Sequence, residues 1–193
     1  MKRAVLAAFA AASILLSVPV EAQTLRWAAP GDAVSFDPNA QLDSFTQNIQ
    51  LMVYDTLVRR NRQLQIEPGL ATSWKIVAPD RWRFTLRPGV KFHDGQPFGA
   101  DDVVATVMRT IDPGSRNKGN LATVKAAEKV DDLTVDLVLT GPYPLLLNDL
   151  TGIFVMSKAW LVEHDAVKPG NTSTGVTRSE ERRVGKECRS RWS

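Results

Sequence analysis

Two pairs of adjacent residues in this 193-residue chain carry groups that could perform acid, base or metal chemistry. His93-Asp94 resembles a catalytic dyad, in which the carboxylate orients the imidazole. Asp101-Asp102 could act as a carboxylate pair for acid and base work. His93 and His164 are the only histidines, and the single cysteine lies near the C-terminus, so we expect no metal site.

Both pairs also fit a structural role. Asp94-Gly95 before Pro97 is a turn signal, and no Ser or Cys nucleophile motif accompanies His93. Adjacent carboxylates at the start of a helix favour its dipole, which is the interpretation we prefer for the aspartate pair. We therefore predict that the chain is not an enzyme and needs no cofactor. An exported hydrolase that uses His93 and Asp94 is the alternative hypothesis.

The excess of positive charge lies at the C-terminal end. Six of the 24 Lys and Arg residues and three of the 21 Asp and Glu residues lie in 178–193, which accounts for the formal net charge of +3. Residues 178–193 resemble the conceptual translation of a sequencing adapter, so we interpret this tail as artefactual; a natural basic tail is the alternative. A nucleic-acid module would rest on this tail alone, and we expect no nucleic-acid partner.

The N-terminal end has the pattern of an export signal. Two basic residues precede an apolar run over residues 4–16, and Val20 and Ala22 supply small side chains before a cleavage site at Gln23. An uncleaved membrane anchor is the alternative, but the apolar stretch is short for a bilayer and Pro19 interrupts it. Residues 1–22 are therefore predicted to be a signal peptide of a soluble periplasmic protein.

The spacing of apolar residues between these ends predicts a mixed α/β segment. Ser44 and Gln47 match a capping box, and the apolar positions after them predict a helix that ends near Arg59 and Arg60. Alternating apolar residues predict half-buried strands, and apolar residues three and four apart predict helices. The other expected elements are strands at 25–28, 82–86 and 135–139 and helices at 101–111, 145–150 and 157–163.

Several sequence blocks together resemble one protein family. The blocks are Phe36-Asp37-Pro38, the run from Glu67 to Trp74, and the run from Phe84 to Gly95, continued by Phe98, Ala100, Asp102 and Val103. In order and spacing they resemble the bacterial extracellular solute-binding proteins of the oligopeptide, dipeptide and nickel class, over residues 24–175. Gly99 stands where the family usually has a Ser or Thr helix cap, and Phe36 replaces the usual Leu.

This resemblance implies a fold and a function. The expected fold is α/β and periplasmic-binding-protein-like (type II), but incomplete: residues 23–66 would be an opening piece of the main lobe and 67–177 a truncated accessory α/β subdomain. The implied function is the solute-binding component of an ABC-type uptake system. Such a component is a monomer that captures peptides or similar small solutes and delivers them to an inner-membrane permease.

The resemblance also implies a ligand-binding segment before the first helix. Counting without gaps from Asp37, the positions that match the family's ligand contacts are Leu42 and Ser44, with Asp43 and Phe45 beside them. Ser44 could face a ligand carboxylate at the helix N-terminus or simply cap the helix. Asp43 could meet a ligand amine or favour the helix dipole, and Phe45 could belong to the core.

Overall fold

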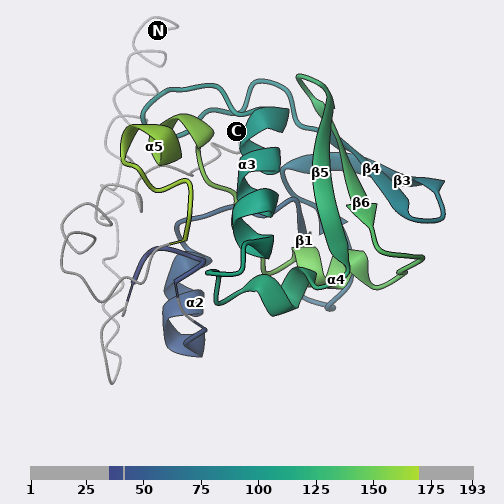
Figure 1. Ribbon diagram of the computed structural model, residues 1–193, viewed down its shortest axis with the longest axis horizontal. Coiled ribbons are helices and arrows are strands. Elements are labelled where there is room, and N and C mark those ends of the chain that lie inside the picture. Colours follow the sequence, from purple (N-terminus) through teal and green to yellow (C-terminus); the bar gives the residue numbers. More distant parts are fainter. Residues whose placement is uncertain (1–34, 41, 170–193) are drawn as a thin grey trace, which may run out of the picture. The chain divides into compact units, whose positions relative to one another are not determined.

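The computed structural model describes residues 35–40 and 42–169 (Figure 1). The expected signal peptide at 1–22, the expected strand at 25–28 and the tail at 178–193 lie outside the described residues.

A four-stranded antiparallel sheet forms the centre of the described part. The strand order is β3-β4-β6-β5, with β3 at Ala71–Ala78, β4 at Arg81–Leu86, β5 at Val124–Asp131 and β6 at Thr134–Leu139. In the β4–β6 register Trp82 lies opposite Leu137 and Phe84 opposite Val135, and all four side chains are buried. The two alternating strands predicted from the sequence are thereby confirmed, whereas β3 and β5 were not expected.

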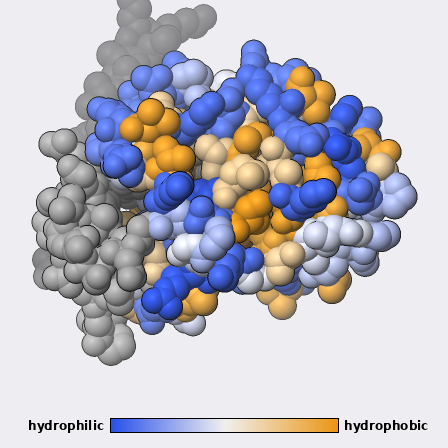
Figure 2. Space-filling model, viewed as in Figure 1, coloured by the Kyte–Doolittle hydropathy of each residue, from blue (hydrophilic) through white to orange (hydrophobic). Residues whose placement is uncertain are grey.

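Helix α3, Ala100–Ile111, packs on the sheet beside β5 (Figure 1). Its stripe of apolar residues buries Val103 and Val107. Gly99 is its N-cap, and Asp112 is its C-cap, followed by Pro113. This confirms the helix predicted at 101–111. Figure 2 shows a mostly hydrophilic surface on this side, with apolar residues gathered where α3 meets β5.

The first described helix is shorter than the sequence pattern predicts. Helix α2 spans Ser44–Gln50, after which the amides of Val53 and Tyr54 both donate to the carbonyl of Gln50 and end it. The helix expected to reach Arg59 and Arg60 is therefore wrong beyond Gln50. The reason is tertiary, because those arginines belong to strand β1, Val58–Arg60, which pairs with β2, Ile66–Pro68.

A short stretch after α2 joins the hairpin to the rest of the core. The amide of Val155 donates to the carbonyl of Asp55 at 3.0 Å, and Thr56 forms a β-bridge with Phe154. Gly69 and Ala71 both donate their amides to the carbonyl of Leu57. The remaining elements are η1 at Lys118–Leu121, α4 at Leu146–Leu150 and α5 at Lys158–Glu163, and the last two confirm the helices predicted at 145–150 and 157–163.

Candidate functional site

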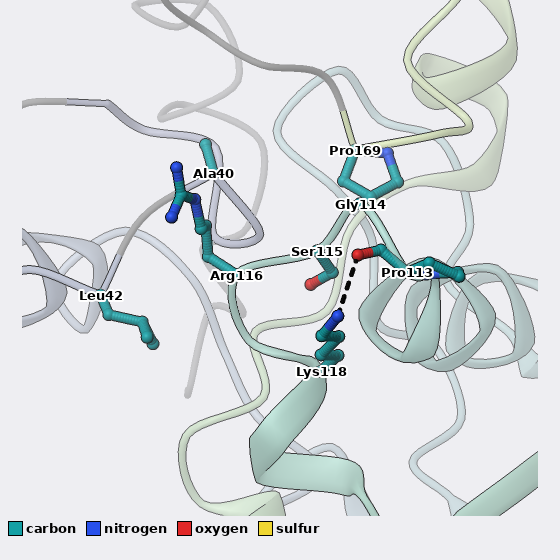
Figure 3. A pocket seen from close by; sticks show the side chains of 8 residues that line it. All are labelled: Ala40, Leu42, Pro113, Gly114, Ser115, Arg116, Lys118 and Pro169. Atoms are coloured by element: carbon teal, nitrogen blue, oxygen red, sulfur yellow. Dashed lines mark hydrogen bonds between the residues drawn. The ribbon is translucent and has the colours of Figure 1, made fainter.

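A pocket of about 610 Å³ lies between the segment that precedes α2 and the loop that follows α3 (Figure 3). Its lining residues come from three separate parts of the chain. They are Ala40 and Leu42, then Pro113, Gly114, Ser115, Arg116 and Lys118, and finally Pro169. Pockets of this size hold small-molecule ligands, so we treat it as the candidate binding site.

The pocket combines cations with apolar surface. Arg116 and Lys118 are exposed side chains of its lining, and the Lys118 ammonium donates to the carbonyl of Pro113 at 3.2 Å (Figure 3). Leu42 and Pro169 add apolar surface, and none of the described lining residues is acidic. The arrangement is suited to a solute that carries a carboxylate or other anionic group beside an apolar part.

Of the four residues that the sequence predicted as ligand contacts, only Leu42 lines this pocket. Asp43 and Ser44 are exposed and Phe45 is half-buried, all at the start of α2.

The cap of α2 differs from the sequence prediction. Asp43 is the N-cap, and its carboxylate accepts hydrogen bonds from the amide of Thr46 at 2.8 Å and the hydroxyl of Thr46 at 2.9 Å. These bonds lower the pKa of Asp43, with the amide bond as the larger cause. The interpretation of Ser44 and Gln47 as a capping box is therefore wrong, because Asp43 has the extended backbone of a cap and Ser44 already lies in the helix.

The aspartate pair lies in the first turn of α3, the position that the helix-dipole interpretation requires, and both carboxylates also make specific hydrogen bonds there. Asp101 accepts hydrogen bonds from the ammonium groups of Lys129 at 2.7 Å and Lys158 at 2.9 Å, which lower its pKa to about 2. Asp102 is buried, which raises its pKa, and accepts from the amides of Gly99 at 2.9 Å and Lys158 at 2.8 Å. Asp102 thus satisfies a free amide at the N-terminus of α3, where the N-cap residue Gly99 has no side chain that could form a capping hydrogen bond.

The two histidines belong to local structure. His93 and Asp94 are exposed in a turn, where Asp94 accepts from the amide of Gln96 at 2.9 Å and Gly95 has a φ of 90°. His164 stacks on Trp160 with ring centroids 4.3 Å apart.

Within residues 35–40 and 42–169, no group of three or more His, Cys, Asp or Glu side chains could hold a metal ion. No helix in the same ranges is long and apolar enough to cross a bilayer.

The basic half of the pocket was missed at the sequence level. Asp112-Pro113-Gly114 indicates where α3 ends, and the structure confirms that stop. Nothing in the sequence, however, indicates that Arg116 and Lys118 lie opposite Leu42, because the two segments are more than 70 residues apart. The sequence signal that could have indicated this surface is the pair of basic residues, Arg116 and Lys118, that follows the end of the helix.

Comparisons with known proteins agree with this architecture. The family model described as "Bacterial extracellular solute-binding proteins, family 5 Middle" matches residues 65–176. A protein named as a probable peptide ABC transporter periplasmic-binding protein, from Sinorhizobium fredii, is 30% identical over 194 aligned positions, which cover 85% of this chain.

Solved structures give the same result. The PBP AgaA of A. tumefaciens, in complex with agropinic acid, is 26% identical with a TM-score of 0.66, over 72% of this chain and 29% of that one. NikZ from Campylobacter jejuni, in complex with Ni(L-His), is 28% identical with a TM-score of 0.63, over 74% of this chain and 28% of that one.

The fold is therefore that of part of a type II periplasmic binding protein. Because the family model covers more than half of the chain, the chain belongs to the bacterial extracellular solute-binding proteins of family 5. It spans 36% of the length of the Sinorhizobium relative. The comparisons do not support the hydrolase alternative.

Proposed function

We propose that this chain is part of the solute-binding component of an ABC-type uptake system and that it captures peptides or similar small solutes. The observation that carries the proposal is the family match over residues 65–176, which includes the loop after α3 that forms the basic side of the pocket. Binding alone requires no reacting group, so the proposal includes no enzymatic activity.

The same proposal covers the export, the oligomeric state, the domain organisation and the ligand contacts of the protein. The first 22 residues act as a signal peptide, and the mature protein works as a periplasmic monomer that delivers its solute to an inner-membrane permease. Residues 23–66 open the main lobe, and 67–177 form most of an accessory subdomain. Leu42, Asp43, Ser44 and Phe45 form one edge of the ligand cleft, and Leu42 is the best supported because it lines the pocket.

The residues that line the pocket form one side of a binding cleft. In a protein with two lobes, a solute stabilises the closed form through contacts on both sides. The apolar side chains of Leu42, Leu51 and Met52 are exposed on the segment that contains α2. Because exposed apolar side chains that lie together often mark a contact surface, their exposure supports the proposal that a further part of the protein packs against this segment.

Ligand binding by the complete reading frame that contains this sequence tests the proposal. The mature protein is titrated calorimetrically with di- to pentapeptides and with sugar–amino acid conjugates that carry carboxylates. A ligand at 100 times its Kd should stabilise the protein by about 2.7 kcal/mol in a melting experiment.

Leu42→Glu should weaken binding at least tenfold, because it places a carboxylate in the lining of the basic pocket. Val162→Glu is the matched control, since Val162 on α5 is also apolar and exposed, at 61% against 56% for Leu42, but does not line the pocket. A protein that binds none of these solutes would contradict the proposed function. Equal affinities of the two variants would contradict the assignment of the pocket.

A further inference from the structure

A buried guanidinium on α3 connects the segments that line the candidate pocket. The Arg109 side chain is only 2% exposed. Its Nη1 and Nη2 each donate to one carboxylate oxygen of Asp37, both at 2.6 Å. Nη1 also donates to Oδ1 of Asn39 at 2.7 Å, and Nε donates to the carbonyl of Ala166 at 2.9 Å. One side chain thus binds two segments that are far from it in the sequence.

Asn39 extends this network to the loop after α3. The side-chain Nδ2 of Asn39 donates to the hydroxyls of Thr110 and Ser115, both at 3.1 Å. Its main-chain carbonyl accepts a hydrogen bond from the main-chain amide of Arg116 at 2.9 Å. Asn117 adds a second connection, since its side-chain amide donates to the carbonyl of Pro38. Asn39, Ser115 and Asn117 are all buried, so these bonds lie out of solvent.

Each segment held by the network leads directly to residues of the pocket lining. Asp37 and Asn39 precede Ala40, and Ala166 lies three residues before Pro169. Ser115 belongs both to the network and to the lining. The relative position of the three lining segments therefore depends on a network in which Arg109 bonds Asp37, Asn39 and Ala166, while Asn39 and Asn117 bond the loop after α3 to the segment before α2.

Stability alone is a weak reason for such a cluster. A buried ion pair gains little over well-packed apolar side chains, because both charges lose their hydration. A guanidinium, in contrast, has planar donors with fixed directions, and it holds a carboxylate by two parallel bonds. The arrangement specifies geometry: the orientation of Asp37 and Asn39 relative to α3 is set by directional bonds rather than by adaptable apolar contact.

From this geometry we propose that Arg109 is a positioning residue for solute binding. It holds the segment before α2 and the segment after α5 directly, and the loop after α3 through Asn39, at the separation that the ligand requires, and it does not touch the ligand. This inference rests on the proposed function for the ligand itself. The positioning of the three lining segments is inferred from the hydrogen bonds alone and can be tested without any ligand.

The chain supplies a matched control. Arg83 on β4 donates to both oxygens of Asp136 on β6, from Nε at 2.7 Å and from Nη2 at 2.9 Å. The Asp136 carboxylate is 2% exposed, whereas the Arg83 side chain is 35% exposed, against 2% for Arg109. This second bidentate pair contacts none of the residues that line the pocket. Arg83→Lys therefore perturbs the same chemistry on the sheet.

The experiment compares Arg109→Lys with Arg83→Lys in the complete protein. Lysine keeps the charge but cannot form the fork of bonds. In hydrogen exchange, Arg109→Lys should increase the rates of the Asn39 and Arg116 amides at least tenfold, while Arg83→Lys leaves both rates unchanged. At a temperature well below both unfolding transitions, Arg109→Lys should raise the Kd for the best solute at least tenfold, with no change for Arg83→Lys.

Asp37→Asn is the second variant if Arg109→Lys does not fold, because it keeps the guanidinium and the shape of the carboxylate. Unchanged exchange at Asn39 and Arg116 would overturn the proposal, and so would an unchanged Kd together with faster exchange. If the wild-type protein binds no solute, the proposed function fails, and the exchange rates alone decide whether Arg109 holds the lining segments.

Discussion

Among the glycines in the part of the chain that the structure describes, Gly69 is the one at which an added Cβ would meet the closest backbone atoms. It lies in the run from Glu67 to Trp74, directly after β2. A Cβ at this position would lie 3.0 Å from the carbonyl oxygen of Leu57 and closer still to that of Thr56. Both neighbours are backbone atoms, so neither can rotate away as a side chain would.

The cost of Gly69→Ala follows from these contacts. The amides of Gly69 and Leu70 donate to the carbonyls of Leu57 and Thr56 at 3.1 and 3.0 Å, so separating the two segments also weakens these bonds. Overpacking costs roughly 1–3 kcal/mol and a weakened hydrogen bond about 1 kcal/mol, which together give about 3 kcal/mol. In a chain of this size that loss lowers Tm by about 6–12 °C.

Thermal unfolding followed by circular dichroism measures this effect on the full chain. Gly141→Ala is the matched control, because nothing lies within 4 Å of the Cβ that it would add. Its expected change is at most about 0.5 kcal/mol, as for other surface substitutions. If Gly69→Ala melts within a degree of both wild type and Gly141→Ala, the close approach of these two segments is wrong.

Three further predictions concern carboxylates. Asp136→Asn should destabilise the chain by about 2–4 kcal/mol in urea unfolding, because it leaves the guanidinium groups of Arg83 and Arg81 without their buried carboxylate; a change below 1 kcal/mol would contradict this. Asp101, with a pKa of about 2 against 3.8, should stabilise the folded state above pH 4 and lose that effect as the pH falls to 2. Because Asp101 is half exposed, its effect should stay below about 1 kcal/mol and shrink in 1 M salt, and an Asp101→Asn variant with the wild-type acid profile would refute it. Asp43→Ala should accelerate amide exchange in the first turn of α2, whereas Ser44→Ala should not; the reverse order would restore Ser44 as the cap.

Several elements could be predicted from the sequence because local pattern and tertiary burial agree. In β4 and β6 the apolar residues that alternate along the sequence are also those that are buried in the core. In α3 the apolar stripe, the acidic first turn and the stop at Asp112-Pro113-Gly114 all indicate the same helix. The sequence blocks around these elements were also sufficient to indicate the family.

Other elements could not be predicted, because their sequence lacks a local signal or carries a misleading one. Strands β3 and β5 are the two edges of the sheet, so each is paired on one side only and several of their residues are exposed. Their apolar residues consequently do not alternate cleanly. Beyond Gln50 the helical spacing of apolar residues continues, but Leu57 and Val58 are buried in the core at the start of the β1–β2 hairpin rather than on a helix face.

The sequence by itself determined the α/β class, the central helix, two of the four strands of the central sheet and the family. Tertiary structure alone decided that Asp37 meets Arg109, 72 residues away, and that Leu42 and Arg116 line one pocket. The physical reason is that periodicity reports which residues are apolar and how they recur along the chain. It carries no information about which distant polar group will satisfy a buried charge, since that partner is selected only when the chain packs.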